Sequence, residues 1–272
     1  MSYMSQHNRT TYDNPDFRRA ALGTALAAMG SARIKLTDEA KPFMGSGLLQ
    51  IAQHSLELAG TAAPPISDRN GLIITAMHST SDFPLILEDA GSKLLLDGYT
   101  AAMPSYKTFC GTRIFRDFKP HRFTRLGDFP DLVQVGEAAE ITRGTLSEGS
   151  ETITLATYGR IVGLSRQTLI NDEIGAFSNL ALAAGRRCAL FENALVFSIL
   201  LENDLGPVLA DGVALFNTAS HANFQDTGTA VNVLTNLSAG RAAIRKQTGL
   251  DGAKLNLRPS ILLVGPDNET AA

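Results

Sequence analysis

The sequence predicts an α+β protein organised around one long helix and the extended segment that precedes it. Three observations indicate this class. Apolar residues recur every three or four positions over residues 172–201, strand-forming residues crowd residues 152–170, and an unbroken apolar run occupies residues 260–266. A chain of 272 residues can hold one or two domains.

The bulk composition is that of an ordinary globular protein. Hydrophobic residues make up 44%, charged residues 19%, and the net charge is -3, so bulk charge does not indicate a polyanionic partner. The two cysteines, Cys110 and Cys188, indicate neither a disulfide framework nor a metal site. No apolar run could span a bilayer, so we expect no membrane partner, and a protein that stays in the cytosol unless it leaves within a larger assembly.

Residues 1–75 predict a helical segment with little core of its own. Asn14 and Pro15 would start one helix and Gly30 would end it, and a second helix fits residues 46–59. Two short amphipathic helices rarely form a stable domain alone. We therefore expect them to pack on the rest of the chain or on other copies of it.

A linker at residues 61–71 precedes a segment from His78 to Tyr99 that contains a third predicted helix. Ser81 or Asp82 would cap this helix, and Gly98 would stop it. Its apolar face would consist of Phe83, Leu87, Ala90 and Leu94.

Residues 100–127 predict an extended arm with a cationic bias, and the segment after it is mostly acidic. Such a pair of arms indicates a head-to-tail contact between identical subunits. The residues expected at this contact are Arg113, Arg116, Arg122, Arg125, Glu137, Glu140, Glu148 and Glu151. The alternative is that residues 107–125 bind nucleic acid through cations and stacked Phe rings. The adjacent acidic stretch and the slightly negative net charge favour the subunit contact.

A hairpin is expected to run directly into the long helix. Its strand formers are Ile153, Leu155, Thr157, Ile161 and Val162, with Gly159 and Gly163 at bulges or close approaches. Asn171 or Asp172 would cap the helix, Gly206-Pro207 would end it, and it would be about 45 Å long. Its apolar face would consist of Phe177, Leu180, Ala184, Cys188, Phe191 and Leu195, which makes Cys188 a buried thiol.

The C-terminal part predicts a compact α/β region. A loop at residues 211–217 precedes a helix at 238–248, which Gly249 would stop, and residues 260–266 would form a buried strand. A further helix would begin at residues 267–272. We therefore expect a chain that is C-terminally incomplete, from a truncated gene or a fragment.

Motifs for chemistry are not found in the sequence. The five histidines lack metal-ligand spacing, and no HExxH, Walker A or G-x-S-x-G motif occurs. His78, Ser79, Ser81 and Asp82 lie too close together for a catalytic triad. His221 is interpreted as an ordinary loop histidine. We therefore expect no catalytic residue, no metal site and no cofactor.

The segments HSTSDFP (78–84) and YGRIVGLSRQTLINDEIGAF (158–177) resemble a known family, the major capsid proteins of tailed phages and prophages. The resemblance is to the type that is encoded with or fused to a ClpP-like prohead protease and is related to the Mu-like major head subunit. It continues through residues 126–160, the DGVALFN loop and residues 237–266, and it covers about residues 76–272.

The resemblance implies the Hong Kong 97-type capsid fold. Residues 76–125 would then be the N-terminal arm. Residues 126–204 would be the E-loop and spine helix of the peripheral domain, and residues 205–272 a partial axial domain. Residues 1–75 resemble the scaffold-like segment of this family, which maturation would remove.

The function implied is that of a structural head subunit, which assembles with other copies into hexamers and pentamers of an icosahedral shell that encloses DNA. Prohead protease, portal and packaged DNA are the other expected partners. The expected location is the virion, and the bacterial host cytoplasm during assembly. The alternative is the remnant of a prohead protease–capsid fusion polypeptide, classed as a peptidase. Residues 126–165 contain no Lys, so the resemblance does not extend to a Lys–Asn crosslink from that loop.

Overall fold

The computed structural model describes residues 14–78, 82–127, 148–163, 165–171, 174–225, 234–250 and 252–271. In this part of the chain the elements are helices and one two-stranded antiparallel sheet, which agrees with an α+β class. The chain divides into two compact units. Unit 1 consists of residues Met1–Ser105 and Arg160–Ala194, and unit 2 consists of residues Tyr106–Gly159 and Leu195–Ala272.

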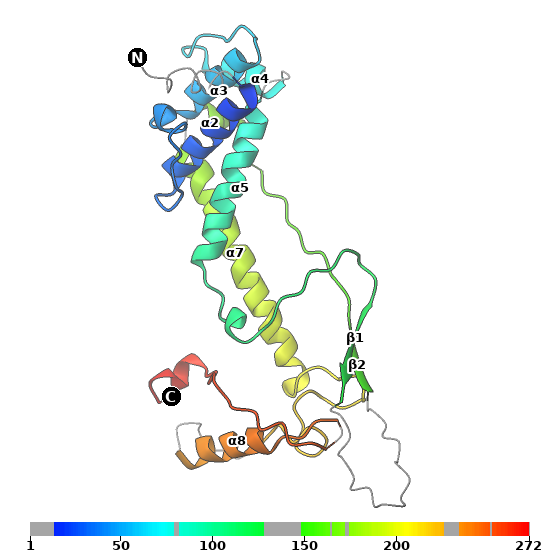
Figure 1. The fold of residues 1–272 in the computed structure, drawn as a ribbon. Coiled ribbons are helices and arrows are strands. Elements are labelled where there is room, and N and C mark those ends of the chain that lie inside the picture. The colour runs from blue at the N-terminus through cyan, green and yellow to red at the C-terminus, as the bar shows by residue number, and fades with distance from the viewer. Residues whose placement is uncertain are drawn as a thin grey trace, which may run out of the picture. The chain divides into compact units, whose positions relative to one another are not determined.

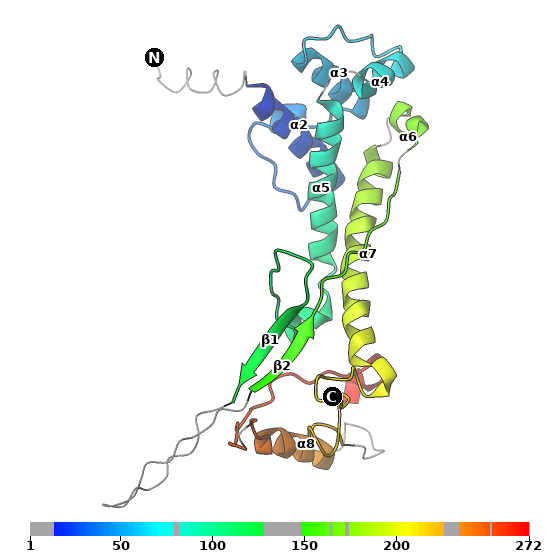
Figure 2. The ribbon, with the colours of Figure 1, turned by 90° about the vertical axis from the view of Figure 1, so that its right-hand side faces the viewer.

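Unit 1 is helical (Figures 1 and 2). Its elements are α2 (Pro15–Gly30), α3 (Leu48–Leu58), α4 (Arg69–His78), α5 (Phe83–Ala101), α6 (Arg166–Ile170) and most of α7 (Ile174–Leu200). The first predicted helix is confirmed with its boundaries, and the Asn14 side chain accepts a hydrogen bond from the Asp16 amide at 3.0 Å. The second is confirmed as α3. Helix α4 was missed, because its first residues were interpreted as linker.

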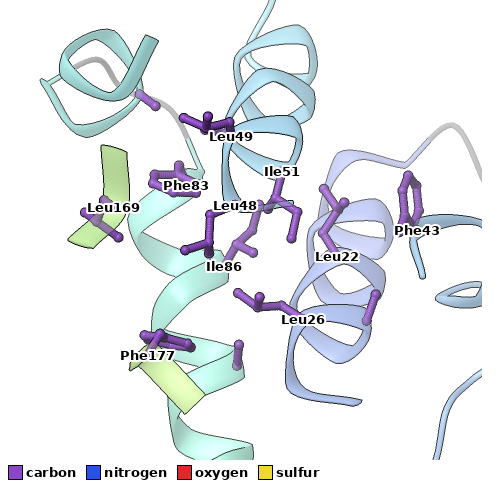
Figure 3. Close-up of a cluster of buried hydrophobic side chains, with 14 of the residues drawn as sticks. Leu22, Leu26, Phe43, Leu48, Leu49, Ile51, Phe83, Ile86, Leu169 and Phe177 are labelled. Atoms are coloured by element: carbon purple, nitrogen blue, oxygen red, sulfur yellow. The ribbon is translucent and has the colours of Figure 1, made fainter. Parts of the chain in front are cut away.

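The core of unit 1 is formed by side chains from all of these helices (Figure 3). Leu22 and Leu26 of α2 meet residues of α3 and α5, and Leu169 of α6 and Phe177 of α7 complete the cluster. Fully buried members include Leu22, Leu26, Leu48, Ile51, Phe83 and Ile86. The partner that the N-terminal helices need is thus provided by α5, α6 and α7 of the same chain.

Polar contacts join α2 to α5 along their length. Arg19 forms an ion pair with Asp82 at 3.2 Å, and the Lys93 ammonium donates to the Thr24 hydroxyl at 2.9 Å. At the far end the Ser31 hydroxyl donates to the Asp97 carboxylate at 2.6 Å. Apolar burial supplies the attraction between the two helices. The polar contacts beside that interface fix how the helices are aligned along their axes.

Helix α5 does not stop at Gly98, so that prediction is wrong. The helix continues to Ala101, and Gly98 lies where α7 passes close by. A Cβ at Gly98 would collide with the Leu182 carbonyl, and one at Gly185 would collide with the Leu95 carbonyl. The glycines are therefore explained by the close approach of two helix backbones.

The long helix is confirmed as α7, but its predicted apolar face is wrong. Among the face residues only Phe177 is buried, and Cys188 is exposed. The face packed on the rest of unit 1 carries Ser178, Gly185 and Ala189 instead. The reason is that α5 approaches α7 along its smallest side chains. Asp172 lies outside the described residues, and Asn171 ends α6 rather than capping α7.

The sheet of unit 2 pairs β1 (His121–Leu126) with β2 (Glu148–Ile153), in a register that places Phe123 opposite Glu151. The hairpin predicted over residues 152–170 is wrong beyond Ile153, because residues 154–163 have no partner strand among the described residues and 166–170 form α6. Gly159 and Gly163 are not close approaches, since a Cβ there would meet nothing within 4 Å.

The rest of the described part of unit 2 consists of the end of α7, helix α8, short 3₁₀ helices and irregular chain. Helix α8 (Leu234–Lys246) confirms the predicted helix but begins earlier. Helix α7 ends at Leu200, before Gly206 at φ +79°, and a 3₁₀ helix (Glu202–Asp204) lies between them. A short 3₁₀ helix of six residues, Pro266–Ala271, forms where a helix was expected to begin. The predicted buried strand at 260–266 is wrong. Ile261 and Leu263 are 51% and 52% exposed, because no described segment pairs with this run.

Candidate subunit interface

The β1–β2 hairpin brings one cation and one acid of the expected contact together within the chain. Arg125 of β1 lies 3.6 Å from the Glu151 carboxylate of β2. Alternation along the strands places both side chains on the same face of the hairpin as Phe123. Glu151 also accepts a hydrogen bond from the Ala210 amide at 3.2 Å, so it links the hairpin to the loop after α7.

The basic arm is ordered through its aromatic residues. The Arg113 guanidinium lies 4.7 Å from the centre of the Phe123 ring, and Phe115 packs edge-on against the same ring at 5.8 Å. Arg116 and Arg122 are exposed. This arrangement gives the Phe residues a structural role in the arm, while most of its cations remain available on the surface.

Of the three remaining residues expected at the contact, the structure describes only Glu148. Glu148 is exposed at the end of β2, opposite Leu126. Glu137 and Glu140 lie outside the described residues. The contact of these arms between subunits stays a prediction, since the Arg125–Glu151 pair lies within one chain.

The described apolar side chains of unit 2 are all at least partly exposed. The buried hydrophobic residues of the described chain belong to unit 1. In unit 2, Ile114 is 97% exposed, and several other apolar side chains from residue 118 to the C-terminal run are about half exposed or more. They include Phe118, Leu126, Ile153, Val208, Leu250, Leu255, Leu257, Ile261 and Leu263. A surface of this kind marks an interaction site rather than a solvated face.

Hydrogen bonds rather than apolar burial hold the DGVALFN loop. His221 contacts the Asp211 carboxylate at 2.8 Å through Nε2 and the Leu215 carbonyl at 3.0 Å through Nδ1. The hydrogen bond to Asp211 is the main cause that raises the pKa of His221 above its ordinary value. The Val213 amide and His221 lower the pKa of Asp211. His221 is therefore a loop histidine with a specific structural role, which the sequence did not indicate because its partner precedes it by ten residues.

The residues that follow the DGVALFN loop anchor α8. The Gln247 side chain donates to the carbonyls of His221 and Ala222 at 3.1 and 2.8 Å. A hollow of about 530 Å³ lies between this loop and the inward face of α8, which carries Gly240, Ala243 and Ile244. Sequence reasoning did not single out the outward face of α8, although its cations recur at helical spacing.

The described part of the chain has no cluster of three or more His, Cys, Asp and Glu side chains that could hold a metal ion. The Ser79–Ser81 stretch of the rejected triad lies outside the described residues. No helix in the described ranges is long and apolar enough to cross a membrane.

Comparison with known families gives one match. A family model described as "Phage capsid protein" matches residues 149–272, which is under half of the chain. The matched part begins in β2 and extends through α6, α7 and α8. No curated protein and no solved structure matches the chain. The match supports a structural capsid role in a bacteriophage virion for this part of the protein.

Proposed function

We propose that this chain is a structural head subunit of a tailed phage or prophage, and that it assembles with other copies into a closed shell around DNA. The premise is the match of residues 149–272 to phage capsid proteins. The resemblance of residues 76–272 to Hong Kong 97-type subunits supports the finer assignment of arm, E-loop, spine helix and axial domain. Hexamers and pentamers of an icosahedral shell are the assembly this assignment implies.

The observation that carries the proposal is the exposed apolar surface of unit 2. Burial of apolar surface stabilises a fold by about 25 cal/mol per Å². Among its described residues unit 2 has no buried hydrophobic side chain, whereas unit 1 of the same chain has a full cluster. A region that cannot bury its apolar residues alone gains that burial by contact with other copies.

The remaining parts of the proposal follow from the resemblance. Residues 1–75 would be the scaffold-like segment, 76–125 the N-terminal arm and 126–204 the peripheral domain, and residues 205–272 would belong to the axial domain. Prohead protease, portal and packaged DNA would be the partners. The subunit would be made in the bacterial host cytoplasm and reside in the virion.

The test is particle formation by the full chain, measured by light scattering and negative-stain electron microscopy. We expect rings or closed shells. The variant Ile261→Asp with Leu263→Asp places charges in the exposed run of unit 2, so it should fold but remain unassembled. The matched control is Leu85→Asp with Leu96→Asp, which also adds two charges, at apolar residues of α5 that are 47% and 62% exposed, and should leave assembly intact. A monomer at high concentration for the unmodified chain would overturn the proposal.

A further inference from the structure

We propose that the outward face of α8 binds the phosphate backbone of DNA. This face carries Arg241, Arg245 and Lys246 beside the small residues Ser238 and Ala242. The proposal rests on the proposed function, because the DNA in question is the DNA that the shell would enclose. It adds a contact surface that neither the family match nor the sequence reasoning assigns.

The two faces of α8 are clearly divided. Gly240, Ala243 and Ile244 turn toward the loop that contains His221, and Gln247 is hydrogen-bonded to that loop. The opposite face lines a separate open hollow of about 580 Å³. Its lining residues are Leu234, Leu237, Ser238, Arg241, Ala242, Arg245 and Lys246. The helix is thus anchored through one face, and the three cations of the other face are exposed.

The charges of this face are not neutralised within the described chain. No ion pair joins Arg241, Arg245 or Lys246 to any carboxylate among the described residues. Several acids of unit 2 have other contacts, as Glu151 has with Arg125 and Asp211 with His221. Residues 234–258 carry five cations, Arg241, Arg245, Lys246, Lys254 and Arg258, against the single acid Asp251. The local charge is therefore strongly positive although the chain has a net charge of -3.

The geometry fits a linear polyanion. Arg241 and Arg245 lie about one helical turn apart, roughly 6 Å along the axis. Ser238 and Ala242 are short enough to let a phosphate chain approach the helix between the long cationic side chains. Arg and Lys on phosphates supply most of the sequence-independent affinity of proteins for DNA.

A second copy of the chain fits this face less well. The centre of a protein–protein interface is depleted of charge and rich in large apolar side chains. From Ser238 to Lys246 the outward face has no apolar side chain larger than that of Ala242. The large apolar side chains of this face, Leu234 and Leu237, lie in the first turn of α8, and most of the exposed apolar residues that would suit a subunit contact lie elsewhere in unit 2.

The experiment measures binding of a short, fluorescently labelled DNA duplex to the full chain by anisotropy over a range of salt concentrations. If the three cations neutralise three phosphates, the logarithm of the affinity should fall with the logarithm of the salt concentration at a slope of about -2.7. The affinity should then fall roughly 40-fold between about 50 and 200 mM salt. Changing Arg241→Gln, Arg245→Gln and Lys246→Gln together should weaken binding and reduce the steepness of the slope by roughly three. The charge-preserving variant Arg241→Lys with Arg245→Lys should retain both the affinity for DNA and its salt dependence.

The matched control removes three exposed cations from unit 1, through Lys35→Gln, Arg186→Gln and Arg187→Gln. It changes net charge equally and should leave the slope unchanged. Far-ultraviolet circular dichroism verifies that all variants fold. An equal effect of the control and α8 variants, or no DNA binding by the unmodified chain, overturns the inference.

Particle imaging of the same variants separates this inference from the proposed function. If the α8 variant forms particles but has lost its affinity for DNA, the result supports both the phosphate-binding face and the shell proposal. DNA binding through α8 by a chain that forms no particles supports the phosphate-binding face and overturns the shell proposal. Failure of the α8 variant to assemble, with its DNA affinity unchanged, makes the face a subunit contact and overturns the inference.

Discussion

Unit 1 and unit 2 belong to one chain but bury their apolar residues in opposite ways. In unit 1, α2, α3 and α5 converge on fully buried residues such as Leu26, Ile51 and Phe83. In unit 2, the described apolar side chains remain partly exposed, and hydrogen bonds around Glu151, His221 and Gln247 hold the loops. The stability of unit 1 therefore comes from contacts within the chain, whereas unit 2 presents an apolar surface that further contacts would cover.

The largest expected effect comes from the core of unit 1. Phe83 is fully buried, so Phe83→Ala should lower the free energy of unfolding by about 3–5 kcal/mol. Urea denaturation followed by circular dichroism measures this. The counterpart in unit 2, Ile261→Ala, should change the stability of the isolated subunit by no more than about 0.5 kcal/mol. Equal losses in the two units would remove the contrast between them.

A smaller effect is expected where α5 and α7 cross. A Cβ at Gly185 would meet backbone atoms of Leu95 and Tyr99, so Gly185→Ala should destabilise unit 1 by about 1–3 kcal/mol. Gly91→Ala is the control within α5, because its Cβ would meet only the Phe177 ring at an ordinary 3.6 Å. The control should stabilise the helix by about 0.5–1 kcal/mol. Thermal unfolding of both variants would show whether the two changes have opposite signs.

The cap of α2 should have an effect of about 1 kcal/mol. Asn14→Ala removes the hydrogen bond from the Asp16 amide and leaves that amide without its side-chain acceptor. Asn14→Ser keeps a capping side chain and serves as the matched control. If α2 did not depend on this cap, the two variants would unfold at the same denaturant concentration.

The smallest effect concerns the loop of unit 2. The pKa of His221 is raised, so its contact with Asp211 stabilises the loop below the ordinary pKa of 6.5 and is lost as pH rises through the raised value. The pKa of Asp211 is lowered, so its share is present above 3.8 and is lost as pH falls through the lowered value. Asp211→Asn should therefore bring the pKa of His221 back toward 6.5.

Nuclear magnetic resonance titration of the His221 ring measures that change. Asp267→Asn removes another carboxylate of unit 2, one that has no contact with His221, and should leave the titration as it was. An unchanged midpoint in Asp211→Asn would show that this contact does not hold the loop in solution.

Local signals predicted the parts of the fold that depend on neighbours in sequence. Asn14, Pro15 and Gly30 defined α2 because caps and breakers act within a few residues. Gly98 was misinterpreted as a stop, since the reason for a glycine there is the backbone of α7, more than eighty residues away. Cys188 was misplaced because α7 packs through small residues rather than through its largest apolar side chains.

Strands were predicted least well, for a related reason. Residues 154–162 and 260–266 contain strand formers, but a strand also needs a partner, and no described segment pairs with either one. At the candidate interface, the sequence identified the charged arms but not the pairing of Arg125 with Glu151 inside one hairpin. The sequence pattern does not single out the cations of α8, because the basic segment at residues 107–125 is denser.

The most direct measurement is hydrogen exchange, read by mass spectrometry, on the free subunit and on assembled particles. The account predicts that α2, α3 and α5 are protected in both states, because their core lies within one chain. Residues 205–225 and 234–271 should gain protection only in particles. Full protection of these residues in the free subunit, or no gain on assembly, would contradict the claim that neighbouring copies complete unit 2.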